Sequence, residues 1–168
     1  IISVLSKWVP TLNKGVLGCS SFIGRNAQGE VIHGRLLDFP LHQSFDLNER
    51  AVTYKIDNLP VIVGLGATGI PYPSISLMTD YGMTLALHQK FTDIFDPKGM
   101  PIFEYIFKLV TECRTEDEVL EFIRRHKTIT TWCLNISFAS GKVISADIDS
   151  HNHYIKEFVV PENGFLYF

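Results

Sequence analysis

The spacing of hydrophobic and polar residues divides the chain into two strand-rich parts with a helical part between them. Between residues 16 and 92, short apolar runs are separated by glycine, proline, asparagine and aspartate, which is typical of β-strands joined by turns. The strands predicted there are Val16–Ile23, Val31–Asp38, Thr53–Ile56, Val61–Leu65, Ile75–Met78 and Met83–Leu87. Asn26 and Gly29 favour a turn between the first two strands, which are therefore expected to form a hairpin.

Apolar residues recur at helical spacing between residues 101 and 127, which predicts two helices. Pro101 suits the first position of the first helix. Thr115 and Glu118 have the spacing of a capping box at the start of the second helix. The basic run Arg124–Lys127 falls at the end of that helix, where it complements the helix dipole, and it is interpreted as a solvated helix end.

The strand pattern returns over residues 131–168. The expected strands are Trp132–Phe138, Lys142–Asp147, Tyr154–Val160 and Phe165–Phe168. The first two form a hairpin around a turn that contains Gly141. This order of strands, helices and strands predicts an α+β domain of layered, mainly antiparallel sheets.

The glycine-rich stretch Gly64–Gly69 is not expected to bind phosphate. It lacks the Lys-Ser/Thr pair that follows a phosphate-binding loop, and Pro71 and Pro73 stand where a helix should begin. The stretch is therefore predicted to be a turn between two strands.

Composition narrows the classes of function. The 168 residues are 46% hydrophobic and 20% charged, which favours one folded domain over a disordered chain. The net charge is −3 and no basic cluster exceeds Arg124–Lys127, so nucleic acid is not an expected partner. The apolar runs are far shorter than the roughly 18 residues of a membrane span. Three cysteines cannot all pair, which argues against a disulfide framework.

Cys19 carries the strongest chemical signal. It follows Gly18 in the first long strand, and Arg35 and Asp38 lie on the strand predicted to pair with it. Arg35 and Asp38 are three residues apart, which places them on opposite faces or near a strand end. A lone cysteine in a strand is more often a small buried residue than a nucleophile, and an arginine near a carboxylate is more often a structural pair. These three residues alone leave both interpretations open.

A longer motif connects these residues. The segment from Gly18 to Phe39 holds a Cys-Ser pair and then a hairpin of the form G-x-x-x-H-G-R-x-x-D-[FY]. It resembles the N-terminal-nucleophile amide hydrolases, above all the branch of acid ceramidase and N-acylethanolamine acid amidase, with choloylglycine hydrolases and penicillin acyltransferases as more distant relatives. The matching positions are Cys19, Gly29, His33, Gly34, Arg35, Asp38 and Phe39. Weaker similarity covers most of residues 16–168, and the resemblance implies αββα layers.

In that family the cysteine of a precursor attacks the peptide bond before it. The resemblance therefore implies autocleavage between Gly18 and Cys19, which would divide the chain into a propeptide-like leader, residues 1–18, and a hydrolase domain, residues 19–168. The freed α-amine then takes the proton of its own thiol, because the two groups titrate near about 8 and about 8.5. The thiolate would attack an amide carbonyl, form a thioester and pass the acyl group to water.

The resemblance also implies roles for the residues of the second strand. Asp38 would hold the α-amine, and Arg35 would balance that charge and steady the thiolate or the polar end of the substrate. His33 lies two residues from Arg35 on the same strand face. It is interpreted as a residue of the hairpin surface, with no catalytic role.

The sequence departs from the family pattern at two places. Where the family has an asparagine that helps to form the oxyanion hole, this chain has His88, followed by Gln89 in place of an acid. A backbone N–H survives any change of side chain, so His88 is expected to donate to the oxyanion through its backbone. A polar residue at a strand end is the alternative.

The second departure concerns a segment that follows a strand like Gly164–Phe168 in the family. Its asparagine supplies the second oxyanion donor, and neither Asn135 nor Asn152 stands in a context to replace it. Loss of one such donor costs about 10²–10³ in rate. The chain starts with Ile1 and stops directly after an apolar run. We therefore expect both ends to be cuts and the hydrolase domain to lack a C-terminal portion.

Other candidates favour structural roles. Cys113 and Cys133 are expected to be buried packing residues. The cluster of Asp147, Asp149, His151 and His153 is interpreted as a solvated edge, and no metal or other cofactor is predicted. Four aromatic residues are expected to fill the core or to line an acyl pocket; they are Trp8, Phe103, Phe107 and Trp132.

Two classes of function follow. The first is a self-processing cysteine hydrolase that cleaves a linear carbon–nitrogen bond in a small N-acyl amide, with acyl transfer as its variant. The second is an incomplete or degenerate domain without catalysis, favoured by His88 and Gln89. A homo-oligomer is left open, and a lysosomal or extracytoplasmic location follows from the resemblance only.

Overall fold

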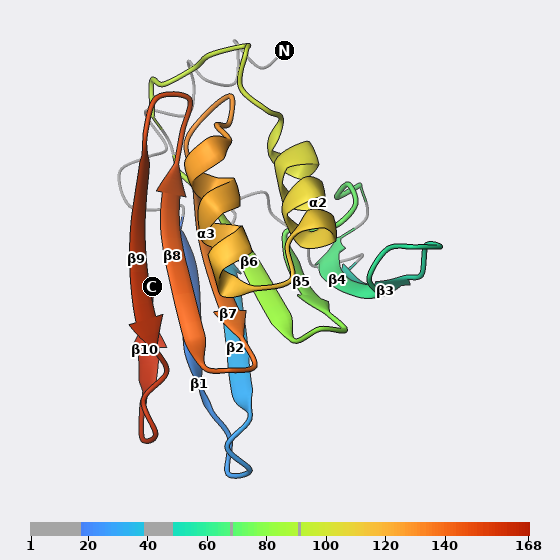
Figure 1. Cartoon of the computed structure of the whole chain (residues 1–168), viewed down its shortest axis with the longest axis vertical. Coiled ribbons are helices and arrows are strands. Elements are labelled where there is room, and N and C mark those ends of the chain that lie inside the picture. Colours follow the sequence, from blue (N-terminus) through green and yellow to red (C-terminus); the bar gives the residue numbers. More distant parts are fainter. Residues whose placement is uncertain (1–17, 39–48, 68, 91) are drawn as a thin grey trace.

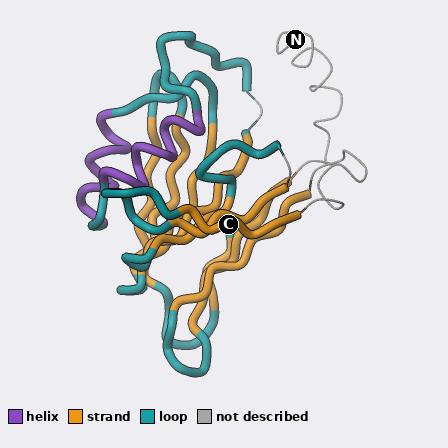
Figure 2. The backbone as a smooth tube through the Cα atoms, turned by 90° about the vertical axis from the view of Figure 1, so that its right-hand side faces the viewer, coloured by secondary structure: helices purple, strands orange, loops and turns teal. Residues whose placement is uncertain are grey.

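The computed structural model describes residues 18–38, 49–67, 69–90 and 92–168, which form two stacked antiparallel sheets with two helices on one outer face (Figure 1). Most of the predicted leader, Trp8 and Phe39 lie outside the described residues. The α+β class with antiparallel sheets is confirmed. Within the described residues, both helices cover the large sheet and the small sheet lies on its other side (Figure 2).

The large sheet has seven strands in the order β3-β4-β5-β6-β7-β8-β9, and each neighbouring pair is antiparallel. The strands are β3 (Glu49–Tyr54), β4 (Ile62–Ala67), β5 (Ser76–Thr79), β6 (Met83–Gln89), β7 (Trp132–Phe138), β8 (Lys142–Ile148) and β9 (His153–Val159). Strands adjacent in the chain are thus adjacent in the sheet, and only the helical segment between β6 and β7 interrupts the meander.

The small sheet has the order β10-β1-β2, with β1 (Gly18–Arg25), β2 (Val31–Asp38) and β10 (Phe165–Tyr167). The predicted hairpin is confirmed. Asn26 organises its turn, because its Oδ1 accepts the backbone N–H groups of Gln28 at 3.0 Å and Glu30 at 2.8 Å. Gly29 adopts a φ of +81°, a conformation that side chains rarely adopt.

The two predicted helices are α2 (Ile102–Glu112) and α3 (Glu116–Arg125). Both halves of the capping box of α3 are present, since the Thr115 side chain accepts the N–H of Glu118 and the Glu118 carboxylate accepts the N–H of Thr115. Pro101 is the N-cap of α2, one position before the predicted one. The apolar sides of both helices pack on one face of the large sheet, where Tyr105, Ile106, Leu109, Val119 and Ile123 are fully buried.

Two details of the strand prediction are wrong for identifiable reasons. Strand β3 begins at Glu49 instead of Thr53, because it is an exposed edge strand and carries charged residues that hide its pattern. The glycine-rich stretch is mostly strand, since β4 continues to Ala67. Gly64 and Gly66 serve close packing there: a Cβ at Gly64 would lie 2.7 Å from the carbonyl oxygen of Pro73.

The described helices have 11 and 10 residues. Among the described residues, no helix reaches the length and apolar character needed to cross a membrane.

Candidate active site

The hairpin of β1 and β2 directs one set of side chains toward the large sheet. Side chains alternate along a strand, so Cys19, Ser21 and Ile23 share the inner face of β1, and Phe22 points outward. Ser21 and Ile23 are fully buried, and Phe22 is 45% exposed. Arg35 is paired with Ser21 and therefore lies on the same inner face as Cys19. The structure thus brings the predicted nucleophile and the predicted cation together between the sheets.

Arg35 bridges Cys19 and the large sheet. Its Nη2 donates to Sγ of Cys19 at 3.3 Å and to the backbone oxygen of Leu87 at 2.7 Å. Burial lowers the pKa of Arg35, and the neighbouring Cys19 partly opposes this effect. An arginine stays protonated in proteins, so a positive charge lies beside the sulfur. The guanidinium group is thus placed next to any negative charge that develops on the sulfur during a reaction.

A buried network of polar side chains lies beneath Cys19. His88 is only 7% exposed, and its Nε2 lies 2.8 Å from Oγ of Ser21 and 3.3 Å from Nδ2 of Asn135. Oδ1 of Asn135 accepts a hydrogen bond from Ser145 at 2.8 Å. The network therefore runs from β1 of the small sheet through β6 and β7 to β8.

The His88 ring is neutral. Burial lowers the pKa of His88 to about 4, the charge of Arg35 adds to this effect, and a hydrogen bond to the backbone of Cys19 partly opposes it. Because Oδ1 of Asn135 accepts from Ser145, its Nδ2 is the group that donates to Nε2 of His88. The ring proton then resides on Nδ1, the nitrogen left to donate to the Cys19 carbonyl.

The backbone N–H of His88 faces another strand. The N–H of Leu87 bonds to the oxygen of Ile75 on the β5 side. Successive N–H groups of a strand point to opposite edges, so the N–H of His88 faces β7, where His88 is paired with Cys133. This direction gives no support to the predicted oxyanion role of that N–H.

Gly18 and Asp38 face each other at the open end of the hairpin. The two residues are paired in register, so the backbone of Asp38 lies opposite the peptide bond predicted to be cleaved. The side chain of Asp38 lies outside the described residues. Its predicted role at the α-amine stays a prediction.

His33 is not the hairpin-surface residue that the sequence suggested. It lies on the inner face of β2, and its Nδ1 is 2.8 Å from Oγ1 of Thr84 on the large sheet. Burial lowers the pKa of His33 to about 4, with smaller contributions from His88 and Arg35. The reason is the stacking of the two sheets, which covers this face of the hairpin.

A cavity of about 430 Å³ opens beside Arg35, between β2 and the face of β4, β5 and β6. Apolar side chains form most of its wall, among them Leu37, Val63, Leu65 and Leu85. His33 and Arg35 form a polar side. Arg35 lines the cavity and also contacts Sγ of Cys19, so its side chain connects the cavity to the candidate nucleophile.

Of the other two cysteines, Cys113 is buried as the sequence predicted, and Cys133 is only partly buried. Cys113 is 4% exposed, and burial raises the pKa of its thiol to about 11. Burial and the neighbouring Asp147 raise the pKa of the Cys133 thiol to about 12. Neither thiol is activated as a nucleophile.

The acidic residues of the predicted solvated edge have protein partners. Asp147 forms an ion pair with Lys90. The Asp149 carboxylate accepts the backbone N–H groups of His151 and Asn152, each at 2.6 Å. Among the aromatic candidates, Phe103 and Trp132 pack against the main core. The ring of Phe107 packs against Tyr72 with centroids 5.4 Å apart.

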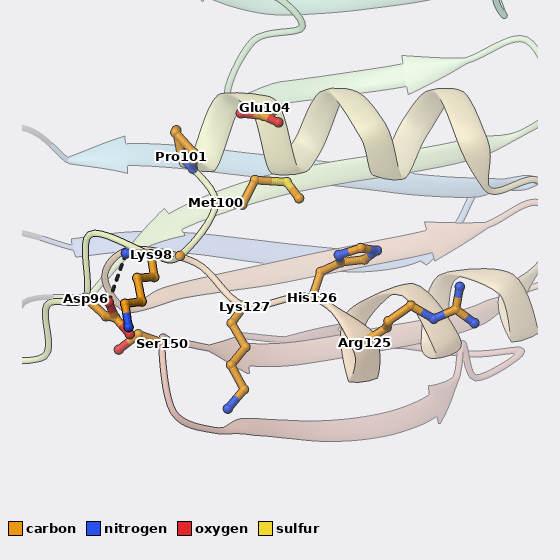
Figure 3. A pocket seen from close by; sticks show the side chains of 10 residues that line it. Asp96, Lys98, Met100, Pro101, Glu104, Arg125, His126, Lys127 and Ser150 are labelled. Atoms are coloured by element: carbon orange, nitrogen blue, oxygen red, sulfur yellow. Dashed lines mark hydrogen bonds between the residues drawn. The ribbon is translucent and has the colours of Figure 1, made fainter.

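A separate cavity of about 610 Å³ lies between the start of α2 and the end of α3 (Figure 3). Arg125, His126 and Lys127 from the basic run line it, and none of the residues around Cys19 does. Figure 3 shows the side chains of Arg125 and Lys127 extending in different directions. This divergence agrees with a solvated helix end.

Sequence reasoning missed Ser21, Asn135 and Ser145 as parts of the site. A signal was present in two of them, since Ser21 lies two residues from Cys19 on the same strand face. Asn135 is a polar residue in the apolar strand β7 and is fully buried. The pairing of β7 with β6 and β8, which brings Asn135 and Ser145 to His88, is not encoded in any local motif.

No protein-family model matches the sequence, and no curated protein does. The structure is similar to an N-acylethanolamine-hydrolyzing acid amidase ortholog from Caenorhabditis elegans, with a TM-score of 0.64 and 15% identity over 89% of this chain and 68% of that one. It is also similar to a variant of conjugated bile acid hydrolase from Clostridium perfringens, with a TM-score of 0.63 and 14% identity. Both are N-terminal-nucleophile hydrolases. This chain has the N-terminal-nucleophile hydrolase fold.

The second similarity covers 83% of this chain and 51% of the bile acid hydrolase, so the chain spans about half of that protein's length. In this chain Cys19 lies on β1, on the face of the small sheet that is turned toward the large sheet. At these identities the likeness concerns the fold, and activity has to be argued from the site itself.

Proposed function

We propose that the chain is a self-processing cysteine amidohydrolase that cleaves a linear N-acyl amide through a thioester on Cys19. The observation that carries this proposal is the 3.3 Å contact between Nη2 of Arg35 and Sγ of Cys19. Cys19 lies at the start of β1, the middle strand of the small sheet in an N-terminal-nucleophile hydrolase fold. A sulfur beside a fixed cation is the environment of a reactive cysteine, whereas burial and neighbouring carboxylates raise the pKa of the other two thiols.

The first step is cleavage of the Gly18–Cys19 peptide bond. Sγ of Cys19 attacks the carbonyl carbon of Gly18, the C–N bond breaks, and the nitrogen takes a proton to become the α-amine. Water then hydrolyses the resulting thioester and frees the thiol. The pairing of Gly18 with Asp38 supports this step, because the bond lies at the start of β1 and the ladder holds it in place against β2.

The second step is cleavage of an external amide. The α-amine of Cys19 takes the thiol proton, and the thiolate attacks the substrate carbonyl while Arg35 stabilises the sulfur's charge. The C–N bond breaks, the amine leaves with a proton, and the acyl group stays on Sγ. Water activated by the α-amine then releases the acid. In this scheme the Asp38 carboxylate holds the amine.

His88 holds the nucleophile in place. Its neutral ring connects the backbone of Cys19 to Ser21 and Asn135, so the start of β1 is tied to β6 and β7. A fixed nucleophile is needed because a misplacement of about 1 Å can cost about 10²-fold in rate. His88 is thus a positioning residue, and no proton transfer is assigned to it.

The acyl part of the substrate fits the cavity beside Arg35. Its volume of about 430 Å³ lies within the range of about 300–1,000 Å³ that ligand sites have, and most of its wall is apolar. A hydrocarbon chain in this cavity would place its carbonyl group at the polar side formed by Arg35.

The decisive experiment is intact-mass analysis after expression. Wild type should split between Gly18 and Cys19, Cys19→Ala should stay whole, and Cys113→Ala should split like wild type, because Cys113 is buried in the core between the helices and the large sheet. If wild type and Cys19→Ala both keep the full-length mass at neutral and acidic pH, self-processing is contradicted. A verified Cys19 N-terminus that turns over neither N-acyl amides nor conjugated bile salts would leave the non-catalytic interpretation. Acyl transfer would appear as acyl amide formed from an added amine.

A further inference from the structure

Strand β2 carries Arg35 but is held by its own sheet on one side only. The order β10-β1-β2 makes β2 an edge strand, and its other edge has no partner strand among the described residues. Within the described part of the chain, two side chains of β2 hydrogen-bond to β6 of the large sheet. Arg35 reaches the backbone oxygen of Leu87, and His33 reaches Thr84. The position of Arg35 therefore depends on more than the ladder between β1 and β2.

The contact of His33 ends in a fixed group of the large sheet. Nδ1 of His33 lies 2.8 Å from Oγ1 of Thr84, and this oxygen lies 2.7 Å from Oγ of Ser137 on β7. Thr84 and Ser137 are paired in register, and Ser137 is fully buried. Because Ser137 and the sheet ladder hold the hydroxyl group of Thr84, that group is a rigid anchor for the ring of His33.

Two attachments fix the direction of β2 as well as its place. Thr84 and Leu87 are three residues apart on β6, which corresponds to about 10 Å along a strand. With the attachment of Arg35 alone, β2 could turn about that point. The guanidinium group would then move relative to Sγ of Cys19.

The strand between the two attachments is stiff. Gly34 separates His33 from Arg35 and is paired with Phe22 of β1. A Cβ at Gly34 would overlap the ring of Phe22, so this ring covers the outer face of β2 between the two inward-facing residues. A displacement of His33 is therefore transmitted to Arg35.

We propose that His33 is a positioning residue for the reaction at Cys19: through Thr84 it fixes β2 on β6 and so holds the guanidinium group of Arg35 beside the sulfur. The inference rests on the proposed function, in which Arg35 stabilises the charge of the sulfur. Nδ1 is the ring atom that carries this role, because Nε2 of His33 is buried and has no hydrogen-bond partner among the described residues.

The test is the rate at which iodoacetamide alkylates Cys19 at pH 7, measured on folded variants and compared within one form of the chain, cleaved or uncleaved. This reagent is small and needs neither the acyl cavity nor turnover. Thr84→Val keeps nearly the same side-chain shape but removes the hydroxyl group. It should slow alkylation about threefold to tenfold, the range that one ordinary hydrogen bond corresponds to. Thr84→Ser should react like wild type.

Thr79→Val is the matched control on the same hairpin of β5 and β6. Thr79 is buried, and its hydroxyl group bonds the backbone of Met83 instead of the small sheet. The variant loses a buried hydroxyl group, as Thr84→Val does, but it should be alkylated at the wild-type rate. Slowing of alkylation by Thr79→Val as large as that by Thr84→Val would contradict a specific role of the contact with His33.

Substitutions of His33 separate the two ring nitrogens. His33→Asn places an amide group near the position of Nδ1 and should react like wild type, whereas His33→Gln places it near Nε2 and should be as slow as Thr84→Val. A purely structural role would leave both variants at the wild-type rate, because urea unfolding verifies that each one is folded in the assay. Fast alkylation of His33→Gln with slow alkylation of His33→Asn would contradict the assignment to Nδ1.

A double-variant cycle decides whether the contact acts through Arg35. Thr84→Val should slow alkylation in wild type and should have no further effect in Arg35→Gln, because the group that it positions is then absent. Equal slowing in both backgrounds, or no slowing in wild type, overturns the proposal. The cycle needs no turnover. If the chain neither cleaves itself nor hydrolyses amides but still shows this coupling, the positioning role stands and the proposed function is wrong.

Discussion

Arg35 holds its guanidinium group between two acceptors, the sulfur of Cys19 and the backbone oxygen of Leu87. The second acceptor matters as much as the first, because it fixes the cation over the site when the sulfur changes partners. A lysine has the charge but lacks the planar fork that reaches two acceptors in fixed directions. At the scale of single residues, the site therefore requires the planar shape of the Arg35 side chain as well as its positive charge.

Arg35→Gln should slow alkylation of Cys19 by iodoacetamide at pH 7 by about 10-fold to 100-fold, because a hydrogen bond to a charged group contributes about 1.5–3 kcal/mol. Arg35→Lys should fall between this variant and wild type. Mass spectrometry of the alkylated peptides measures the rate, and the raised pKa values of Cys113 and Cys133 keep those thiols slow. Arg124→Gln, an exposed change at the end of α3, should react like wild type. Equal rates in all four proteins would contradict the role of Arg35.

The two buried histidines make stability depend on pH. Burial lowers the pKa of His33 and of His88 from 6.5 to about 4, so below pH 6.5 the unfolded chain binds protons that the folded chain does not. Their contribution is complete above pH 6.5 and is lost as the pH falls toward 4.

Urea unfolding at pH 7.5 and pH 4.5 should show a loss of about 2 kcal/mol for each histidine, a value reduced because neither ring is wholly buried. His88→Gln should remove its share of this pH dependence, and His151→Gln, a change at an exposed residue, should remove none. A free energy of unfolding that is constant between these pH values would show that the rings are not buried as neutral groups.

At the scale of elements, the acyl cavity depends on how β2 lies over β4, β5 and β6. Leu65 stands at its wall and is 52% exposed, so a larger side chain there can narrow the cavity without disturbing the core. The cavity's shape is therefore accessible to substitution, unlike the buried network under Cys19.

Leu65→Trp should lower kcat/KM for a long-chain N-acyl amide several-fold relative to a short-chain one, because the indole occupies space that the longer chain needs. Kinetics on a series of acyl lengths with one amine part measures the effect. Ile56→Trp, at another exposed apolar position outside the cavity, is the control and should leave the preference unchanged. The cavity is not the acyl site if both variants keep the wild-type preference.

Local patterns predicted the elements well where neighbours in the chain decide the structure. The hairpin of β1 and β2 and the capping box at Thr115 and Glu118 are decided within a few residues. The position of His33 was predicted wrongly, since its burial depends on the large sheet, where its contact residue Thr84 lies 51 residues further along the chain. The contact of Asn135 with His88 also joins residues that are distant in sequence, 47 positions apart. Such contacts follow from strand order, which no short motif encodes.

At the scale of the whole molecule, the site exists only where the two sheets meet. Cys19 and Arg35 come from the small sheet, and Leu87, His88 and Asn135 come from the large one. The buried residues Ile23, Val143 and Val160 form a second core cluster that joins the sheets. The chemistry is therefore expected to begin after the sheets have stacked.

The hairpin register also decides the reaction order of the proposed self-cleavage. Gly18, Cys19 and Arg35 belong to one hairpin of one chain, so the reaction is unimolecular. Its half-life should stay the same when the protein is diluted 100-fold, as measured by the fraction of cleaved chain over time. Mature wild type added to Cys19→Ala should leave that chain whole. A half-life that lengthens on dilution would mean that one molecule cuts another, and each chain would then depend on meeting a partner before it could mature.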